Sequence, residues 1–390
     1  MLKERLMIKD LNKHMRYLKK YSGFKNRLFE NNSEIDSICK QFGITNYTIN
    51  SDGSLDVQGD VILSYRKLTE IPLNFRMVTG KFDCSSNILT SLKGCPQFVG
   101  GDFSCLDCDL KTLEFGPEEV EGHYNCSFNK LTSLEGCAQI IGSEDNPKDL
   151  NCSNNQLISL KGASEVMHGS IFCNSNKLKD LTGCPKKIGN HLYCRKNVMT
   201  SLKGAPKIIG GDLNCMENML ENLEFYPEEI GKSNLPRTGN VYLSFNKLKS
   251  LDGAPEMING NFYCDNNLID SLEDSKVVEV LGTFNCSNNK LTSLQGCPKV
   301  IDSNLDCSMN QITMILIEDL DFITIESKLI CEGNPIYEIF KVFGDFEKFK
   351  KSLDYNYLQE PNEIIEIYFE EACEELGAQK PDQIKGYVFI

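Results

Sequence analysis

The chain has 390 residues, with 41 Lys and Arg against 55 Asp and Glu, so its formal net charge is −14. This excess of acidic residues disfavours general nucleic-acid binding, which requires neutralisation of phosphates. No signal peptide and no apolar run of membrane length is recognised, so we expect no membrane association and a cytoplasmic localisation.

Residues 1–60 lack any repeat and are expected to form an N-terminal cap. Leu11, Met15 and Leu18 recur at helical spacing, which predicts a helix over residues 2–29. This helix is basic, and it either presents a solvated face or contacts an acidic or membrane surface. A second short helix is expected around residues 34–42, and YTINSDGSLDVQGDV predicts two strands about a Ser-Asp-Gly turn.

Residues 61–336 are organised as about 13 units with a period near 21 residues. Each unit reads apolar-x-Cys-x-x-Asn-x-Leu-x-x-Leu-x-Gly-(Cys/Ala)-Pro-x-x-Ile-Gly, as over residues 82–100. A fixed period of this length indicates a solenoid, in which short strands stack into a parallel sheet. The Gly suits a turn with positive φ, and the Pro predicts an extended, non-helical return to the next strand. The Asn is predicted to bond backbone groups at the turn after the strand.

The repeat resembles the leucine-rich repeat, whose signature is L-x-L-x-x-(N/C)-x-L. Its Pro-led return is similar to the short repeats of bacterial leucine-rich effector proteins. The resemblance implies an α/β repeat solenoid: a leucine-rich repeat arc with a parallel β-sheet on the concave face, non-helical convex returns and helical caps at both ends. With their flanks, the repeats are also similar to uncharacterised leucine-rich repeat proteins of tailed bacteriophages. That resemblance implies a phage-encoded protein in the host bacterial cytoplasm, but no established activity.

The 18 cysteines follow the repeat, and 11 of them occupy the inward position of the predicted strand. This placement predicts core thiols in a reducing compartment rather than a disulfide framework. Cys105 and Cys108 form the one C-x-x-C pair, whereas a zinc site usually requires two such pairs. Metal binding is the alternative to our preferred interpretation, in which Cys108 fills an Asn slot. We expect no cofactor and no metal.

The outward strand residues change character in the middle units, where aromatic residues, Met and Arg replace small polar ones. These residue types are typical of protein-binding hot spots. The predicted partner-binding residues are Phe172, Asn174, Tyr193, Arg195, Met216, Tyr242, Tyr263 and Asp265. Two insertions, at residues 142–149 and 231–239, are expected to form the rims of this surface. The competing interpretation is that tyrosine simply favours strands.

Residues 337–390 are expected to form a helical C-terminal cap, which a solenoid needs to cover its last repeat. One helix is predicted over residues 336–353, with Phe340, Phe343, Phe346 and Phe349 at a spacing of three. Pro361 is predicted to open a second helix. Its apolar stripe would comprise Ile364, Tyr368, Ala372 and Leu376.

The chain is therefore predicted to be a non-enzymatic scaffold that binds a host or viral protein through its concave face, with counter-defence as one role. The alternatives are a structural or assembly protein of a virion, and capture of a small molecule or nucleotide. Its four His have no metal spacing, and its glycines belong to a repeating turn rather than a phosphate loop. Cys373 is the one C-terminal candidate nucleophile, and acidic neighbours disfavour its thiolate.

Overall fold

The computed structural model describes residues 32–231, 239–320 and 328–390. It contains two compact units, which are treated separately below. Unit 1 comprises Met1–Leu157 and Lys161–Gly169, and unit 2 comprises Ile158–Leu160 and Ser170–Ile390. The basic helix expected over residues 2–29 lies outside the described residues.

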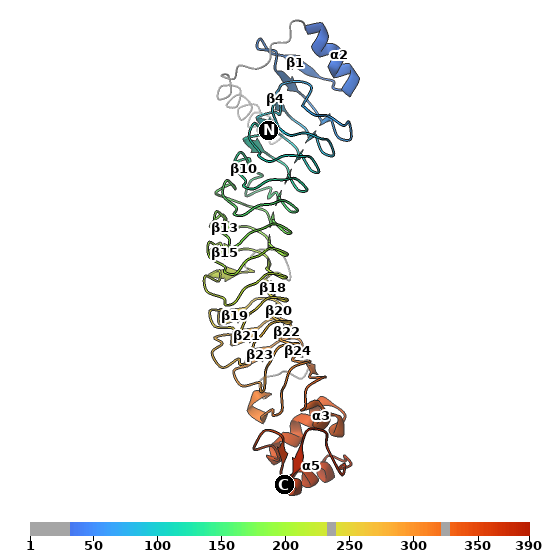
Figure 1. Cartoon of the computed structure of the whole chain (residues 1–390), viewed down its shortest axis with the longest axis vertical. Coiled ribbons are helices and arrows are strands. Elements are labelled where there is room, and N and C mark those ends of the chain that lie inside the picture. Colours follow the sequence, from blue (N-terminus) through green and yellow to red (C-terminus); the bar gives the residue numbers. More distant parts are fainter. Residues whose placement is uncertain (1–31, 232–238, 321–327) are drawn as a thin grey trace, which may run out of the picture. The chain divides into compact units, whose positions relative to one another are not determined.

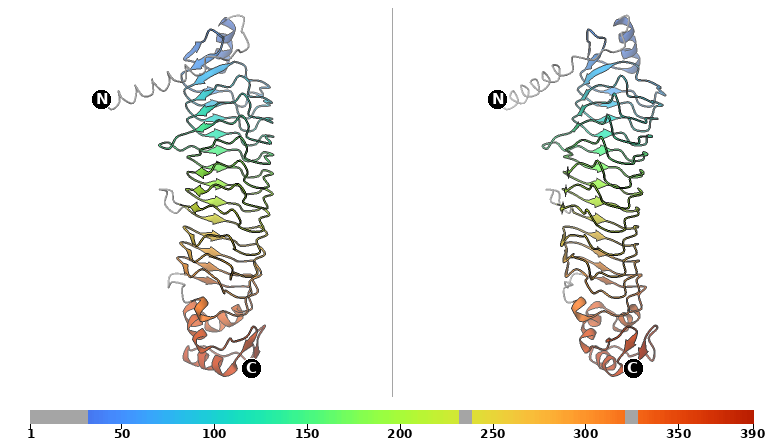
Figure 2. Two further views of the ribbon diagram at one scale, coloured as in Figure 1. Left: turned by 90° about the vertical axis from the view of Figure 1, so that its left-hand side faces the viewer. Right: turned by 60° about the vertical axis from the view of Figure 1, so that its left-hand side comes forward.

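Each repeat contributes one two-residue strand to a parallel ladder. In unit 1 the strands are β3 (Val61–Ile62), β5 (Phe82–Asp83), β7 (Phe103–Ser104), β9 (Tyr124–Asn125) and β11 (Leu150–Asn151). In unit 2 they are β12 (Ile171–Phe172), β14 (Leu192–Tyr193), β16 (Leu213–Asn214), β18 (Val241–Tyr242), β20 (Phe262–Tyr263), β22 (Phe284–Asn285), β24 (Leu305–Asp306) and β25 (Leu329–Ile330). Figure 2 shows these strands as stacked arrows. The predicted parallel-strand solenoid is confirmed.

The returns between ladder strands are extended, and they carry short strands that the sequence analysis did not predict (Figure 1). In unit 1, β4 (Phe75–Val78), β6 (Phe98–Val99), β8 (Glu119–Val120) and β10 (Ile140–Ile141) pair in parallel. The hairpin of β1 (Tyr47–Ile49) and β2 (Leu55–Val57) forms as predicted, and β2 joins β4. In unit 2 the return strands are β13 (Lys187–Ile188), β15 (Ile208–Ile209) and β17 (Glu229–Ile230), then β19 (Met257–Ile258), β21 (Glu279–Val280) and β23 (Val300–Ile301).

A ladder of buried asparagines holds successive turns together. Asn197 is representative: its Nδ2 donates to the carbonyl oxygens of Cys173 at 3.1 Å and Cys194 at 3.0 Å. Its Oδ1 accepts the backbone N–H of Leu178 at 3.0 Å. One amide thus pairs three buried backbone groups from two turns, and these groups would be costly to leave unpaired. The predicted role of the Asn is confirmed.

The residue just before each Asn slot has a left-handed backbone, which the sequence analysis did not predict. Asp107, Asn154, Asn266 and Asn288 adopt φ values between 51° and 56° there. Such residues tolerate this region well. Bulkier residues share the conformation, namely Tyr65, Phe128, Lys196, Glu217, Phe245 and Met309. The repeat therefore imposes this backbone conformation and directs these side chains outward, even for residue types that disfavour a positive φ.

All 18 cysteines are free thiols, and all but Cys184 and Cys297 are buried. The ladder cysteines therefore serve as core residues, as predicted. Cys108 lies in an Asn slot, where its Sγ donates to the carbonyl oxygen of Cys84 at 3.5 Å. Burial raises the pKa of the Cys108 thiol to about 11, so it stays protonated and apolar at neutral pH.

The helices agree with the sequence only in part. The predicted short helix is confirmed as α2 (Asn32–Phe42). The single helix predicted over residues 336–353 is wrong, because Gly344 (φ 81°) ends α3 (Tyr337–Phe343) and Asp345 caps α4 (Phe346–Ser352). Short 3₁₀ turns lie at Ile317–Asp319 and Leu353–Tyr355.

The second predicted C-terminal helix begins later than expected and buries a different stripe. Pro361 does not open it, because the strand β26 (Glu363–Ile364) intervenes and pairs with β27 (Val388–Phe389). The helix α5 (Glu366–Glu375) buries Phe369, Ala372 and Cys373, while Tyr368 is exposed. The aromatic cluster of Phe343, Tyr357 and Phe369 organises this region. None of the described helices has the length and apolar character needed to span a membrane.

Candidate functional site

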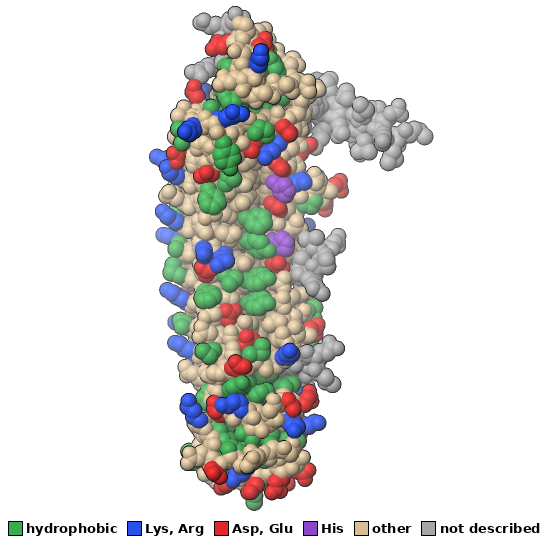
Figure 3. Space-filling model, turned by 90° about the vertical axis from the view of Figure 1, so that its right-hand side faces the viewer, with side chains coloured by type: hydrophobic (Ala, Val, Ile, Leu, Met, Phe, Trp, Pro, Cys, Tyr) green, Lys and Arg blue, Asp and Glu red, His purple; other side chains and the backbone are tan. Residues whose placement is uncertain are grey.

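The ladder of unit 2 presents four columns of outward side chains, one residue of each column per turn. Their positions are counted from the anchor, which is the buried Cys or Leu that follows each strand, such as Cys194 or Leu243. The columns are the last residue of each strand and the residues one after, three before and two after the anchor. We call the outward surface of the ladder from β12 to β20 the aromatic face. It comprises the last residue of each of these strands and the residues of the other three columns beside it. Figure 3 shows hydrophobic side chains gathered on this side of the molecule, with a histidine beside them. The residues come together because parallel strands in register place equivalent positions about 4.8 Å apart.

The aromatic rings of this face form two pairs. The ring centroids of Phe172 and Tyr193 lie 5.3 Å apart, edge to face. Tyr242 and Tyr263 stack at 5.2 Å with an interplanar angle of 4°. β16, which carries Asn214 at this position, lies between the pairs, because it hydrogen-bonds to both β14 and β18. All four rings are half-buried, so each has a face or edge available to a partner.

The second column, one residue past the buried anchor, is polar except at Met216, and its polar residues are hydrogen-bonded or ion-paired. Asn174 Oδ1 accepts the backbone N–H of Arg195 at 2.9 Å. The Arg195 guanidinium pairs with Glu217, through Nε to Oε1 at 2.6 Å and through Nη2. Asp265 Oδ1 accepts the hydroxyl of Ser244 at 2.6 Å. Arg195 is thus not an isolated cation, since a carboxylate from the next turn already compensates its charge.

The third column, three residues before the anchor, links neighbouring turns through hydrogen bonds. His191 Nδ1 accepts the backbone N–H of Asp212 at 2.9 Å, and Asp212 Oδ1 accepts the backbone N–H of Asn240 at 2.9 Å. Asn240 Oδ1 accepts the backbone N–H of Asn261 at 2.9 Å. His191 Nδ1 also lies 3.4 Å from Asp212 Oδ2.

Burial and a nearby carboxylate set the protonation of the tyrosines. Burial, with a further contribution from Asp212, raises the pKa of Tyr193 to about 12. The same two causes raise the pKa of Tyr242. Burial acts to raise the pKa of Asp212, but its contact with His191 and backbone N–H groups outweighs burial and lowers it. At neutral pH Tyr193 and Tyr242 are therefore neutral phenols, and Asp212 is an ionised carboxylate beside them.

The structure brings together all eight residues that the sequence analysis selected. Met216 lies beside Asn214, whose Oδ1 accepts its backbone N–H at 3.1 Å. The expected rims stay a prediction. The insertion at residues 142–149 belongs to unit 1, where Gly142 bridges Pro147, and most of residues 231–239 lie outside the described residues.

Sequence reasoning noted His191 as a possible contact near Tyr193 but preferred a solvent-facing histidine, and it missed Asp212, Glu217 and Phe245 as parts of this face. His191 stacks on Tyr193 with ring centroids 5.4 Å apart. Phe245 is 52% exposed, although it is a large apolar residue with a φ of 58°. The signal was present in the sequence, because each residue occupies a fixed phase of the repeat. The phases three before and two after the anchor were not read as outward columns.

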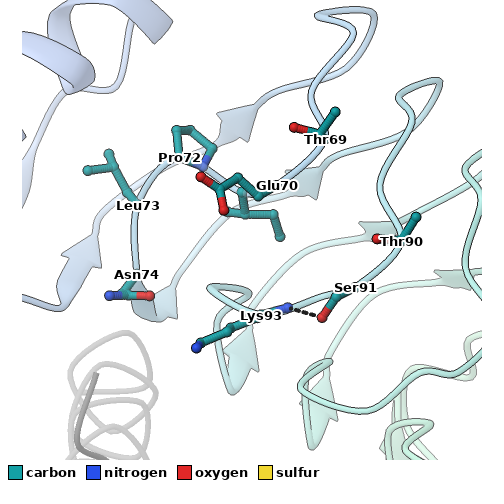
Figure 4. Close-up of a pocket in the computed structure, with 9 residues that line it drawn as sticks. Thr69, Glu70, Pro72, Leu73, Asn74, Thr90, Ser91 and Lys93 are labelled. Carbon is teal, nitrogen blue, oxygen red and sulfur yellow. Dashed lines mark hydrogen bonds between the residues drawn. The ribbon is translucent and has the colours of Figure 1, made fainter. Parts of the chain in front are cut away.

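Other chemical sites find little support in the described residues. Cys373 is buried, and burial raises the pKa of its thiol to about 11, so it is a poor nucleophile at neutral pH. Among the described residues, no cluster of three or more His, Cys, Asp or Glu is arranged to hold a metal ion. Unit 1 has a hollow of about 310 Å³. Figure 4 shows that Thr69 and Thr90 line it from adjacent turns, and there the backbone N–H of Lys93 donates to Ser91 Oγ.

Comparison with solved structures finds distant similarity to proteins that include leucine-rich repeat proteins. YopM from Yersinia enterocolitica WA-314 is 19% identical with a TM-score of 0.40, covering 66% of this chain and 63% of YopM. YopM from Yersinia pestis, described as a leucine-rich effector protein, is 18% identical with a TM-score of 0.32, covering 71% and 83%. A leucine-rich repeat protein of Leptospira interrogans is 17% identical with a TM-score of 0.32, covering 70% and 90%. The chain thus spans less than two thirds of the first YopM.

No protein-family model matches the sequence, and no curated protein matches it. These alignments are too distant to carry a functional argument. The functional proposal therefore rests on the residues of the aromatic face.

Proposed function

We propose that this protein is a non-enzymatic scaffold that binds another protein through the aromatic face of unit 2. Two ring contacts on the outward side of one ladder carry the proposal, namely Phe172 with Tyr193 and Tyr242 with Tyr263. The two rings of each contact lie on adjacent strands, and Asn214 on β16 separates the two contacts. Half-buried tyrosines supply large contact area at low entropic cost, because their rings are already held by neighbours. Aromatic residues are also the side chains most enriched at binding hot spots.

Polar groups around the rings give such a surface specificity. Asp212 and the His191 imidazole lie on one side of the rings, and the Arg195–Glu217 pair lies on the other. A partner that docks on the rings would meet an imidazole, a carboxylate and a compensated ion pair at fixed positions. Mixed polar and aromatic composition of this kind is typical of a protein interface with a polar rim.

The proposed partner is a host or viral protein, and counter-defence is the role we favour. This part of the proposal rests on the resemblance of the repeats and flanks to phage proteins. In this proposal the caps at both ends serve stability alone, and the protein acts in the cytoplasm of the bacterial host.

Alanine substitution tests the proposed face. The double variant Tyr193→Ala and Tyr242→Ala should lose partner capture from infected cells by at least about tenfold, since two hot-spot tyrosines typically contribute more than about 2 kcal/mol. The matched control is Tyr65→Ala with Phe128→Ala, which removes two exposed aromatic residues from the ladder of unit 1. Capture that survives the first pair, or is lost equally with the control pair, would refute the site.

A further inference from the structure

Charge is distributed very unevenly over neighbouring turns of unit 2. Residues 170–210 contain eight Lys and Arg against one Asp, and residues 211–231 contain six Asp and Glu with no Lys or Arg. The whole chain, by contrast, carries a net charge of −14. A basic stretch is therefore followed directly by an acidic one, and both belong to the same unit.

The return strands of these turns form a sheet of their own, in the order β13-β15-β17. Figure 1 shows β13 and β15 on the side of unit 2 away from ladder strands such as β18. The register places Lys187 beside Ile208, and Ile208 beside Glu229. The second residue of each strand is buried, whereas Lys187 is exposed and Ile208 and Glu229 are half-exposed. We call these three strands, each with the residue before it, the return sheet.

Charge changes sign from one edge of the return sheet to the other. The residues that precede the three strands are Lys186, Lys207 and Glu228, and each of them is exposed. The backbone N–H of Lys207 donates to the carbonyl oxygen of Lys186 at 2.8 Å, which places these two residues on adjacent strands. One edge strand thus presents two lysines and the other presents two glutamates, with Ile208 between them.

Contacts within the chain leave the lysine edge uncompensated. Lys207 Nζ lies 2.7 Å from Glu228 Oε1, so the charge of the central lysine is balanced by its neighbour. Among the described residues, Lys186 and Lys187 have no ion-pair partner. Two exposed ammonium groups at one edge attract a surface that presents carboxylates with the same spacing.

We propose that two copies of this chain associate through the return sheet, face to face, about a two-fold axis parallel to β15. Such an axis reverses the order of the strands in the partner and keeps their direction. Lys187 then faces the partner's Glu229, and the reciprocal contact forms at the other edge. Lys186 faces the partner's Glu228 in the same way. Ile208 meets its own counterpart at the axis and supplies an apolar centre.

A second copy fits this surface better than another anionic partner does. A nucleic acid would be attracted by the lysine edge but repelled by the glutamate edge about 10 Å away, since neighbouring strands lie about 4.8 Å apart. A uniformly acidic protein would meet the same repulsion. A surface with both charges in the reverse order matches both edges, and the chain itself carries one.

Sedimentation equilibrium of the full chain tests this interface. We expect a monomer–dimer equilibrium in about 50 mM salt, with association at least about tenfold weaker in about 500 mM salt, because salt screens exposed charges. Lys186→Glu with Lys187→Glu should be monomeric, and so should Glu228→Lys with Glu229→Lys. An equimolar mixture of the two variants should dimerise again, because opposite charges then face each other at both edges.

The matched control reverses two lysines of unit 2 outside the return sheet. Lys276 and Lys290 are both exposed, and Lys276→Glu with Lys290→Glu changes the net charge by the same amount as the first variant. This control should dimerise as the unsubstituted protein does. Equal loss of the dimer in the control would trace the effect to net charge and would overturn the assignment.

Further contrary results would also refute the interface. One is a chain that stays monomeric at about 0.1 mM in low salt, whether or not it binds an oligonucleotide. Another is a dimer that survives reversal of either edge, or a mixture of the two variants that stays monomeric. Species larger than a dimer would indicate a head-to-tail contact. The return sheet shares no residue with the aromatic face, so Tyr193→Ala with Tyr242→Ala should leave the dimer intact, and failure of either proposal leaves the other standing.

Discussion

Exchanging Asn and Cys in the ladder slot measures what the asparagine ladder contributes to stability. Asn197 makes three hydrogen bonds of 3.0–3.1 Å to buried backbone groups. A cysteine in its place keeps at most one weak donor, as the 3.5 Å contact of Cys108 Sγ shows. A net hydrogen bond contributes about 1 kcal/mol, and an unpaired buried group costs about 1–3 kcal/mol. Asn197→Cys should therefore lower the free energy of unfolding by about 2–3 kcal/mol.

The reciprocal variant should move stability in the opposite direction. Cys108→Asn places an amide where Sγ now contacts the carbonyl oxygens of Cys84 and Leu106, at 3.5 and 3.8 Å. By the geometry of Asn197, its oxygen should accept the backbone N–H of Leu89. Two good bonds in place of weak ones should raise the free energy of unfolding by about 1–2 kcal/mol.

Native-state hydrogen exchange is the appropriate assay, because a solenoid can open in sections rather than as one cooperative unit. The amide of Leu89 should exchange about tenfold more slowly in Cys108→Asn, since about 1.4 kcal/mol corresponds to a factor of ten. The amide of Leu178 should exchange faster in Asn197→Cys. Unchanged exchange at both amides, or destabilisation by Cys108→Asn, would refute the energetic role assigned to the ladder.

Three further predictions follow from the core, the charges and the turns. Native protein should react slowly with iodoacetamide at pH 8, beginning at the half-exposed Cys184 and Cys297, because burial raises the pKa of both thiols. Complete unfolding in urea should make all 18 thiols reactive. Rapid labelling of the native protein would contradict this. The pKa of Asp212 is lowered by folding, so its contribution to stability is present above its unfolded pKa of about 3.9 and is lost as pH falls through the lower folded value. In Asp212→Asn, the free energy of unfolding measured by urea titration should fall less steeply as the pH is lowered. A pH profile that matches that of the unsubstituted protein would argue against this contribution of Asp212. Gly344→Ala should cost about 1 kcal/mol in thermal unfolding, because φ is 81° although a Cβ there meets nothing within 4 Å; an unaffected midpoint would contradict the strain argument.

The sequence alone determined the repeat, its inward residues and its asparagines. A strand residue such as Cys194 and a slot residue such as Asn197 recur at a fixed phase, and each phase has one structural environment in a solenoid. The eight residues selected for the aromatic face also follow from phase, because parallel strands in register place equal phases side by side. Local stop signals at Gly344 and Asp345 were present in the sequence as well, but the prediction of one helix over residues 336–353 rested on the apolar spacing alone.

Only the tertiary structure decided how these residues are used. It pairs Arg195 with Glu217, and it stacks Tyr242 on Tyr263. Such contacts join residues about 20 or more positions apart, and their geometry depends on how each turn packs on the next. The repeat thus specifies which side chains face outward, whereas pairing, burial and cavity volume arise from the stacking of neighbouring turns, which no single repeat encodes.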